Sequence, residues 1–583
     1  MTGFRRTAEL DGPHRRVAVI GAQHPAVERL LSLLEQVFPI RFVREDGPDA
    51  VLVLDPDRLP EAPAGLPRLA LAARTQHEGR ATMVALADDG QLARPLRGRT
   101  IADSAPDGEL PPPRPGVDRV LGSVDRRPVW WQVGESLEAG GGPEAGGGPE
   151  AWGGLEAGGG PEAASTRAGG DTGGLWCSAY PLAEPGTGET LREHLRAGRF
   201  MGLLPLVHFL GEVMGAEGWT LPAPRASFVV DDPNLHWPSY GYLKYGELIA
   251  HAGRHGYHMG LATVPLDRWW VDPRAARLVR DNGSVLSLLM HGNDHSTHEL
   301  GRLRGDREAE SAMAQALRRT AALERRAGVG VERVMVPPHS RCSEEALRAM
   351  LRLGIEGVCL NRSYPWRDAE TAPTPLGEWY PAELVAGGMP MLLRSPLVDP
   401  RDDLAFRALL GQPLILYGHH WDFADGLDIL AQVARDINTL GEVRWGPLGP
   451  IARESYATRR VGETLFVRMH ARGVAIEVPA GVRELRVLAP EPLGGAGWRR
   501  LAHGGDVAEM AFEGGIGFSE PLLLDERPRA PESLPADARG RIELKLIPDR
   551  PLGPTAVLAP RPRPWPLIRR AMVEGRDRVQ GLR

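Results

Sequence analysis

Three apolar runs in the middle of the chain end on acidic or imidazole side chains. The runs cover residues 228–230, 284–290 and 413–417, and they stop on Asp231-Asp232, on His291 to His295 and on His419-His420. Continuous apolar runs of this kind are typical of strands buried on both faces of a parallel sheet. Because the carboxyl ends of such strands meet on one side of the fold, we expect these polar side chains to gather there.

Between and around these runs, segments of helical periodicity alternate with further apolar strands. A helix is expected from Ser343, a good N-cap residue, to Gly354, which suits a helix end. Other helices are expected near residues 242–255, 272–280, 306–327 and 427–440. About seven strand–helix units predict an α/β fold, a distorted (β/α)7 barrel, over residues 173–458 with a lead-in helix near 190–213.

The first 134 residues carry a separate strand–helix–strand pattern. Residues 16–21 and 49–55 are expected to form buried strands, and residues 25–38 have apolar side chains at helical spacing. This βαβ order predicts a small, Rossmann-like α/β domain at 1–134. It has no glycine-rich phosphate-binding loop, so a nucleotide site is not indicated.

The segments after these two regions differ in composition. Residues 135–172 repeat Glu, Ala, Gly and Pro and are expected to be a flexible linker, because such a sequence buries too little apolar surface to fold. Residues 459–550 alternate apolar and polar positions with period two, which predicts a β-sandwich. The tail at 551–583 is rich in arginine. Our first interpretation of it is a solvated helix, and the second is contact with a partner or a membrane surface.

Composition narrows the classes of partner and compartment. The 583 residues carry a net charge of -6, so nucleic acid is not an expected partner. The three cysteines, Cys177, Cys342 and Cys359, do not have zinc-knuckle spacing. The most apolar longer segment, residues 201–214, is too short to span a bilayer, and the amino-terminal residues lack an apolar signal core. We therefore expect a cytoplasmic protein; the pattern does not specify an oligomeric state.

The polar residues at the strand ends suit a catalytic metal site. Asp232, His291 and His295 would provide one carboxylate and two imidazoles and leave coordination positions open, with zinc the favoured divalent metal. Asp231 would then act as a general base, and either His419 or His420 as a general acid. Four residues beside these motifs are candidates for substrate binding: Asn234, His236, His339 and Trp421.

Residues 226–445 resemble the polysaccharide deacetylase (NodB-like) superfamily. Asp231-Asp232 and His291 to His295 match its Asp-Asp and His-x-x-x-His motifs. Its final Leu-x-His motif is altered to Leu416-Tyr417-Gly418-His419-His420, so either histidine could be the acid. The sequence departs from the family at three other positions: Gly292 replaces Ser or Thr, Val336 replaces the Arg of an Arg-x-Pro motif, and His339 replaces an aromatic residue.

The resemblance implies a distorted (β/α)7 barrel and a metal-dependent hydrolase that removes an acyl group by cleaving a non-peptide C–N or an ester bond. It assigns Asp231 as base, Asp232, His291 and His295 as metal ligands, and His419 as acid. The expected substrate is a carbohydrate or an acylated amino sugar. Because the family's usual secretion signal is missing, a sugar precursor suits this chain better than a finished wall polymer.

Two other functions stay open at the level of sequence. A glycoside hydrolase on a similar barrel needs two carboxylates about 5–9.5 Å apart, and Asp231 with Asp294 is the only obvious pair. A catalytically silent sugar-binding protein of surface-polymer synthesis would suit the flanking domains. The presence of Asp231, which metal binding alone does not need, argues against it.

Overall fold

The computed structural model describes residues 12–581 apart from residues 22–23, 45–46, 64, 74–80, 107–109, 111, 116, 135–173, 187, 363, 365–376, 400–401, 491–497, 504–505, 514–515, 525–540, 549, 559 and 561–563. The predicted linker at 135–172 therefore lies outside the described residues.

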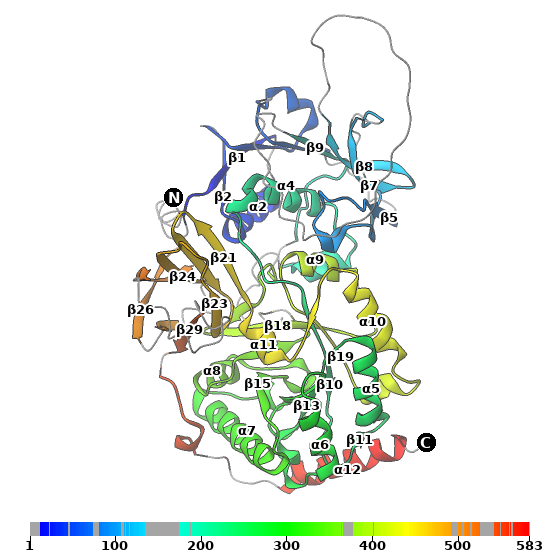
Figure 1. The fold of residues 1–583 in the computed structure, drawn as a ribbon, viewed down its shortest axis with the longest axis vertical. Helices are drawn as coiled ribbons and strands as arrows, with labels where there is room; N and C mark the ends of the chain where they lie inside the picture. The colour runs from blue at the N-terminus through cyan, green and yellow to red at the C-terminus, as the bar shows by residue number, and fades with distance from the viewer. Residues whose placement is uncertain are drawn as a thin grey trace, which may run out of the picture.

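The centre of the molecule is a closed barrel of seven parallel strands (Figure 1). Its strands are β10 (Arg225–Asp231), β13 (Met259–Thr263), β14 (Leu286–Met290), β15 (Val331–Met335), β16 (Gly357–Leu360), β18 (Met389–Pro396) and β19 (Leu414–Gly418). Strand β10 pairs in parallel with both β13 and β19, which closes the barrel. The predicted seven-strand barrel is confirmed.

The barrel interior is a packed apolar core. Each of the seven strands contributes one fully buried side chain to a single cluster: Val229, Ala262, Leu289, Val334, Cys359, Leu392 and Ile415. Such inward-facing layers are the usual filling of a small parallel barrel. The interior is therefore closed to ligands, and polar chemistry is confined to the ends of the strands.

Helices cover the outside of the barrel. They are α5 (Tyr245–His255), α6 (Pro273–Asp281), α7 (Asp306–Ala327), α8 (Glu344–Arg352), α9 (Leu404–Leu409) and α10 (Asp428–Asn438). Helix α11 (Leu448–Arg453) differs, because its Leu448, Ile451 and Ala452 belong to the interior cluster. As expected, the Ser343 side chain caps α8 by accepting a hydrogen bond from the Ala346 N–H, at 3.2 Å. The barrel is distorted: among the described residues, the short β17 (Glu383–Val385), which pairs antiparallel with β18, lies where a helix would connect β16 and β18. Strand β20 (Arg444–Trp445) adds a short eighth strand beside β10.

The amino-terminal sheet is larger than the predicted βαβ unit. Its order is β2-β1-β3-β4-β9-β8-β7-β5-β6, parallel from β2 to β9 and antiparallel beyond. The strands are β1 (Arg15–Ile20), β2 (Ile40–Val43), β3 (Ala50–Val53), β4 (Arg68–Leu71), β5 (Ala81–Leu86), β6 (Thr100–Ser104), β7 (Arg119–Val124), β8 (Arg127–Val133) and β9 (Leu175–Ser178), with α2 (Pro25–Val37) between β1 and β2.

Strand β9 corrects the predicted boundary at residue 134. It pairs with β4 and β8 in the amino-terminal sheet, although the sequence assigned residues after 172 to the barrel region. Of the two helices that follow, α3 (Leu191–Arg196) and α4 (Leu204–Met214), the second packs on this sheet through Phe209, whose ring lies 5.6 Å from that of Trp176. Strand pairing joins residues across the low-complexity segment, so a change in composition did not mark the boundary of the unit.

The third unit contains nine β-strands among its described residues. They are β21 (Tyr456–Val461), β22 (Thr464–Met469), β23 (Gly473–Glu477), β24 (Glu484–Pro490), β25 (Trp498–His503), β26 (Asp506–Glu513), β27 (Ile516–Ser519), β28 (Leu522–Leu523) and β29 (Arg541–Pro548). They pair in the order β21-β22-β24-β27-β26-β25-β29-β23, with β28 beside β24. The sandwich arrangement of these strands stays a prediction.

The arginine-rich tail returns to the barrel. Residues 550–558 run along α7, where the Arg318 side chain donates to the Val557 carbonyl at 2.8 Å and the Ser311 hydroxyl donates to the Leu558 carbonyl at 2.6 Å. The last helix, α12 (Pro564–Gly581), then lies at the end of the barrel near β11 (Ser239–Tyr240), which pairs with β12 (Leu243–Lys244) (Figure 1). None of the described helices combines the length and apolar character needed to cross a bilayer.

Candidate metal centre

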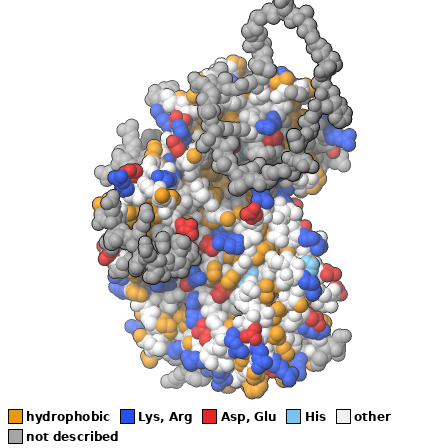
Figure 2. All heavy atoms as spheres, viewed as in Figure 1, with side chains coloured by type: hydrophobic (Ala, Val, Ile, Leu, Met, Phe, Trp, Pro, Cys, Tyr) orange, Lys and Arg blue, Asp and Glu red, His pale blue; other side chains and the backbone are white. Residues whose placement is uncertain are grey.

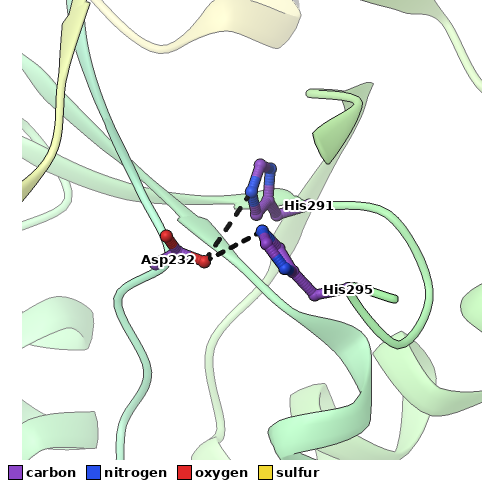
Figure 3. Close-up of side chains that lie close together, drawn as sticks. All are labelled: Asp232, His291 and His295. Carbon is purple, nitrogen blue, oxygen red and sulfur yellow. Dashed lines mark ion pairs between the residues drawn. The ribbon is translucent and has the colours of Figure 1, made fainter. Parts of the chain in front are cut away.

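Asp232, His291 and His295 meet at the carboxyl ends of β10 and β14 (Figure 3). The Asp232 Oδ1 atom lies 3.2 Å from His295 Nε2 and 3.9 Å from His291 Nε2. One donor atom from each residue lies within 4.8 Å of the other two. The structure thus brings together the three side chains that the sequence predicted as metal ligands.

Hydrogen bonds outside this cluster hold both histidines. The ring of His291 is bonded through Nδ1 to the Val336 carbonyl at 2.8 Å, which leaves Nε2 as the lone-pair nitrogen facing Asp232. The Glu299 carboxylate accepts hydrogen bonds from the N–H groups of Asn293, Asp294 and His295, at 2.8, 2.9 and 3.0 Å. Glu299 therefore fixes the turn that carries His295.

Gly292, one of the departures from the family motif, is required by the same turn. Its φ is +66°, and a Cβ at this position would collide with the Glu299 carboxylate and with Pro338. A side chain here would be strained by the backbone and would also displace Glu299. The change from Ser or Thr to Gly is thus explained by packing around Glu299.

The protonation states suit metal ligands. Burial raises the pKa of Asp232, but His295, Arg570 and His291 outweigh it and hold this pKa well below its ordinary value. Burial lowers the pKa of His295 to about 4 and also lowers that of His291, where the two aspartates oppose it. At neutral pH the centre therefore presents one ionised carboxylate and two neutral imidazoles, which fits a divalent cation of the zinc type.

Asp231, the predicted base, is buried in a paired state. Both of its carboxylate oxygens accept from the Arg394 guanidinium, at 2.7 and 2.8 Å, and the Tyr417 ring lies 3.9 Å from the guanidinium carbon. Burial raises the pKa of Asp231, but Arg394 and His291 outweigh it, so the net effect is a lowered pKa. Asp231 is thus ionised and fixed by a partner that the sequence pattern did not predict.

Arg394 is the main site residue that the sequence analysis missed. It lies on β18 in the triplet Arg394-Ser395-Pro396, which has the Arg-x-Pro spacing of the family motif. The family motif predicts this arginine at the position of Val336 instead. The Arg-x-Pro spacing is present in the sequence, but on a later strand than the one where it was expected.

The two histidines after β19 have different surroundings. His419 is partly exposed, its ring stacks on Trp421 with centroids 4.3 Å apart, and it contributes to lowering the pKa of both Asp231 and Asp232. His420 is buried, with its Nε2 atom 3.7 Å from the Asp577 carboxylate of α12. Of the two candidate acids, His419 is the one beside the aspartates.

The four predicted substrate-binding residues divide into two pairs. Asn234 accepts from the His236 N–H at 3.0 Å, and His236 lies between Glu574 and the Asp267 carbonyl; both side chains are buried. Trp421 is half-exposed, and His339 is exposed with its ring 5.3 Å from that of His295. Only Trp421 and His339 are thus open to a substrate in this arrangement, and the burial of Asn234 and His236 opposes the prediction made for them.

The buried face of α12 packs on this end of the barrel, so the prediction of a solvated helix is wrong. Arg570 donates to the Asp232 carboxylate at 3.2 Å, to the Asp232 carbonyl at 2.6 Å and to Asp267 at 2.9 Å. Further contacts join Glu574 to His236, Asp577 to the Tyr240 hydroxyl and Arg569 to the His295 carbonyl. Side chains of α12 thus contact the predicted ligands, although they lie more than 270 positions away in sequence.

Arg570 shares the Asp232 carboxylate that a metal would need, so removing its charge should strengthen cation binding. We expect the Arg570→Gln variant to bind Zn²⁺ more tightly than the natural sequence by on the order of tenfold, because a fixed positive charge repels a second cation at close range. Competition with a chromogenic chelator measures the affinity. Arg578→Gln is the control, since Arg578 lies on the same helix over the Trp237 ring. Equal Zn²⁺ affinity in Arg570→Gln and the natural sequence would contradict this prediction.

The central region of the chain is similar to proteins of known structure. No protein-family model matches the chain, and no curated protein matches it in sequence. A structure from Mycobacterium smegmatis described as a polysaccharide deacetylase matches 40% of this chain and 91% of its own, with 14% identity and a TM-score of 0.30. A family 4 carbohydrate esterase from Streptomyces lividans matches 39% of this chain and 93% of its own, with 15% identity and a TM-score of 0.24.

A family 4 pseudoenzyme from Bacillus anthracis also matches, over 38% of this chain and 67% of its own, with 11% identity and a TM-score of 0.23. All three names belong to the group that the sequence motifs resemble. Similarity at this level does not bear on the activity of this chain. Its barrel is established by its own strand pairings.

Proposed function

We propose that the protein is a metal-dependent hydrolase that removes an acyl group from a sugar or sugar precursor by cleaving a C–N or an ester bond. One observation carries the proposal. The donor set Asp232, His291 and His295 lies beside a second aspartate, Asp231, that is buried, ionised and fixed by Arg394. The three donor residues alone would be enough for a structural metal. An additional ionised carboxylate such as Asp231 is suited to accept a proton during catalysis.

The residues divide the chemistry between them. Asp232, His291 and His295 would hold a divalent cation, which supplies Lewis acidity toward an acyl oxygen and lowers the pKa of water. Asp231 accepts the proton of the attacking water; each of its oxygens keeps a lone pair beside the Arg394 hydrogen bonds. His419 donates a proton to the departing amine or alcohol, and its ring is oriented by Trp421.

The half-exposed Trp421 indole is the proposed contact for the sugar ring. An exposed indole offers a flat apolar surface next to the proton donor, and binding sites combine such surfaces with a few polar groups. His339, whose ring lies next to that of His295, is the proposed polar contact for the substrate.

A glycoside hydrolase is less well supported. Asp294, the second carboxylate that this function needs, accepts hydrogen bonds from the N–H and the hydroxyl of Ser296, at 3.0 and 2.6 Å. Its carboxylate therefore serves the loop that carries His295. The second candidate is a catalytically silent sugar-binding protein, which one observation favours: Arg570 binds the same Asp232 carboxylate as the metal would.

Acetate release tests the proposed function. The purified, zinc-loaded protein is incubated with a panel of N-acetylated amino sugars and O-acetylated sugars, as monomers and as short oligomers, and acetate is quantified. We expect release from at least one substrate class. Zinc-loaded protein that binds these sugars and releases no acetate would instead support the silent sugar-binding protein.

A further inference from the structure

The side of α12 that faces away from the barrel is apolar. Trp565, Ile568, Met572 and Val579 are 65%, 50%, 67% and 53% exposed. At 3.6 residues per turn these four side chains fall within an arc of about 60°. They form one stripe along the helix, which we call the outer stripe.

This arrangement is the reverse of an ordinary surface helix. The buried side chains on the inner side of α12 are the charged Arg570 and Asp577. A surface helix normally buries its apolar face and exposes its charged face. Apolar side chains that are exposed together at helical spacing mark a contact surface.

Exposed tryptophans surround the same helix. Trp237 lies against Arg578 of α12, with the guanidinium carbon 3.8 Å from the ring centroid. Trp269 contacts the ring of His236, which Glu574 of α12 binds, and the Trp270 indole N–H donates to the His236 carbonyl. All three tryptophans are exposed by more than a third. Tryptophan is enriched where proteins meet the interface between a bilayer and water.

The charge of the tail adds to this pattern. Residues 561–583 hold seven arginines against two carboxylates, a formal charge of +5, in a chain whose net charge is -6. Figure 2 shows hydrophobic and basic side chains side by side at the lower edge of the molecule, where Figure 1 shows α12. This combination of an apolar stripe, tryptophans and arginines fits an anionic lipid surface.

We propose that α12 is an interfacial helix that docks this end of the barrel on an anionic membrane. The outer stripe inserts between lipid headgroups, the surrounding tryptophans lie at the interface, and exposed arginines of the helix such as Arg576 and Arg578 bind the phosphates, whereas Arg570 stays buried against the barrel. A second copy of the chain fits the surface less well, because two outer stripes in contact would bring two arginine-rich tails together. The proposal does not depend on the proposed hydrolase activity. It would place the candidate metal centre, which α12 covers, next to the bilayer.

Co-sedimentation with lipid vesicles tests the proposal on the full-length protein. One set of vesicles is pure phosphatidylcholine, and the other contains about one third phosphatidylglycerol. We expect sedimentation with the anionic vesicles, little with the neutral ones, and weaker binding at high salt because salt screens the arginines. The variant Trp565→Ser/Ile568→Ser/Met572→Ser should lower the partition into anionic vesicles by at least about tenfold.

A matched control removes three exposed apolar side chains elsewhere, in the variant Met83→Ser/Val398→Ser/Leu523→Ser, and should bind like the natural sequence. No binding of the natural sequence to anionic vesicles overturns the proposal, as does equal binding to both vesicle types. If the stripe variant binds anionic vesicles as well as the natural sequence does, another surface contacts the lipid, and the proposal is also overturned. If the natural sequence is a dimer in gel filtration and the stripe variant is a monomer, the occupant of the stripe is a second copy of the chain.

Discussion

Replacing Asp231 with asparagine should lower the rate of acyl release by about 10²–10⁴-fold, the usual contribution of a general base. Bound metal should stay the same, because Asp231 pairs with Arg394 and is not among the three donors. The asparagine side chain would keep one acceptor oxygen for Arg394, so the fold should persist. Acetate release and metal content are measured on the same preparation.

Asp232→Asn is the contrasting variant, since it removes a charged donor from the cluster. Metal content and activity should fall together in this protein. If Asp231→Asn and the natural sequence release acetate at equal rates with equal metal, Asp231 has no part in the mechanism.

Replacing Arg394 with methionine should lower the free energy of unfolding by about 3–5 kcal/mol, because it leaves the buried Asp231 carboxylate without its partner. The pair should also set the response to acid. In the folded protein the pKa of Asp231 is lowered, so the stabilisation is present above the ordinary carboxyl pKa of about 3.9 and is lost as the pH falls through the folded value.

Without Arg394 the effect of burial is no longer outweighed, and the pKa of Asp231 should rise. The acidic limb of the pH–activity profile should then move to higher pH. The double variant Arg394→Met/Asp231→Asn, which removes both charges, should be more stable than Arg394→Met alone. A double variant as unstable as the sum of its two single variants would show that the two residues do not stabilise each other.

The candidate ligands could be predicted because they follow their strands directly. Asp232 and His291 each come straight after a buried apolar run, and a parallel barrel brings such strand ends together. His295 follows four positions later on a turn that Glu299 holds. Local pattern and topology were enough for these three residues.

Residues that reach the site from distant segments could not be predicted in this way. Arg394 lies 163 positions from Asp231, and Arg570 lies 338 positions from Asp232. The arginine-rich composition of the tail agrees equally well with a solvated helix and with a docked one. The pairing of β9 with β4 likewise depends on contacts that no local pattern encodes.

Metal content measured by inductively coupled plasma mass spectrometry tests the candidate metal centre most directly. We expect about one divalent ion per chain in the natural sequence and none in His291→Ala/His295→Ala. The control is His251→Ala/His255→Ala, which removes a second His-x-x-x-His pair, on α5, whose rings are 4.3 Å apart and which is not part of the donor cluster. The control should keep its metal. A full equivalent of metal in His291→Ala/His295→Ala would contradict the account and show that the metal is bound elsewhere.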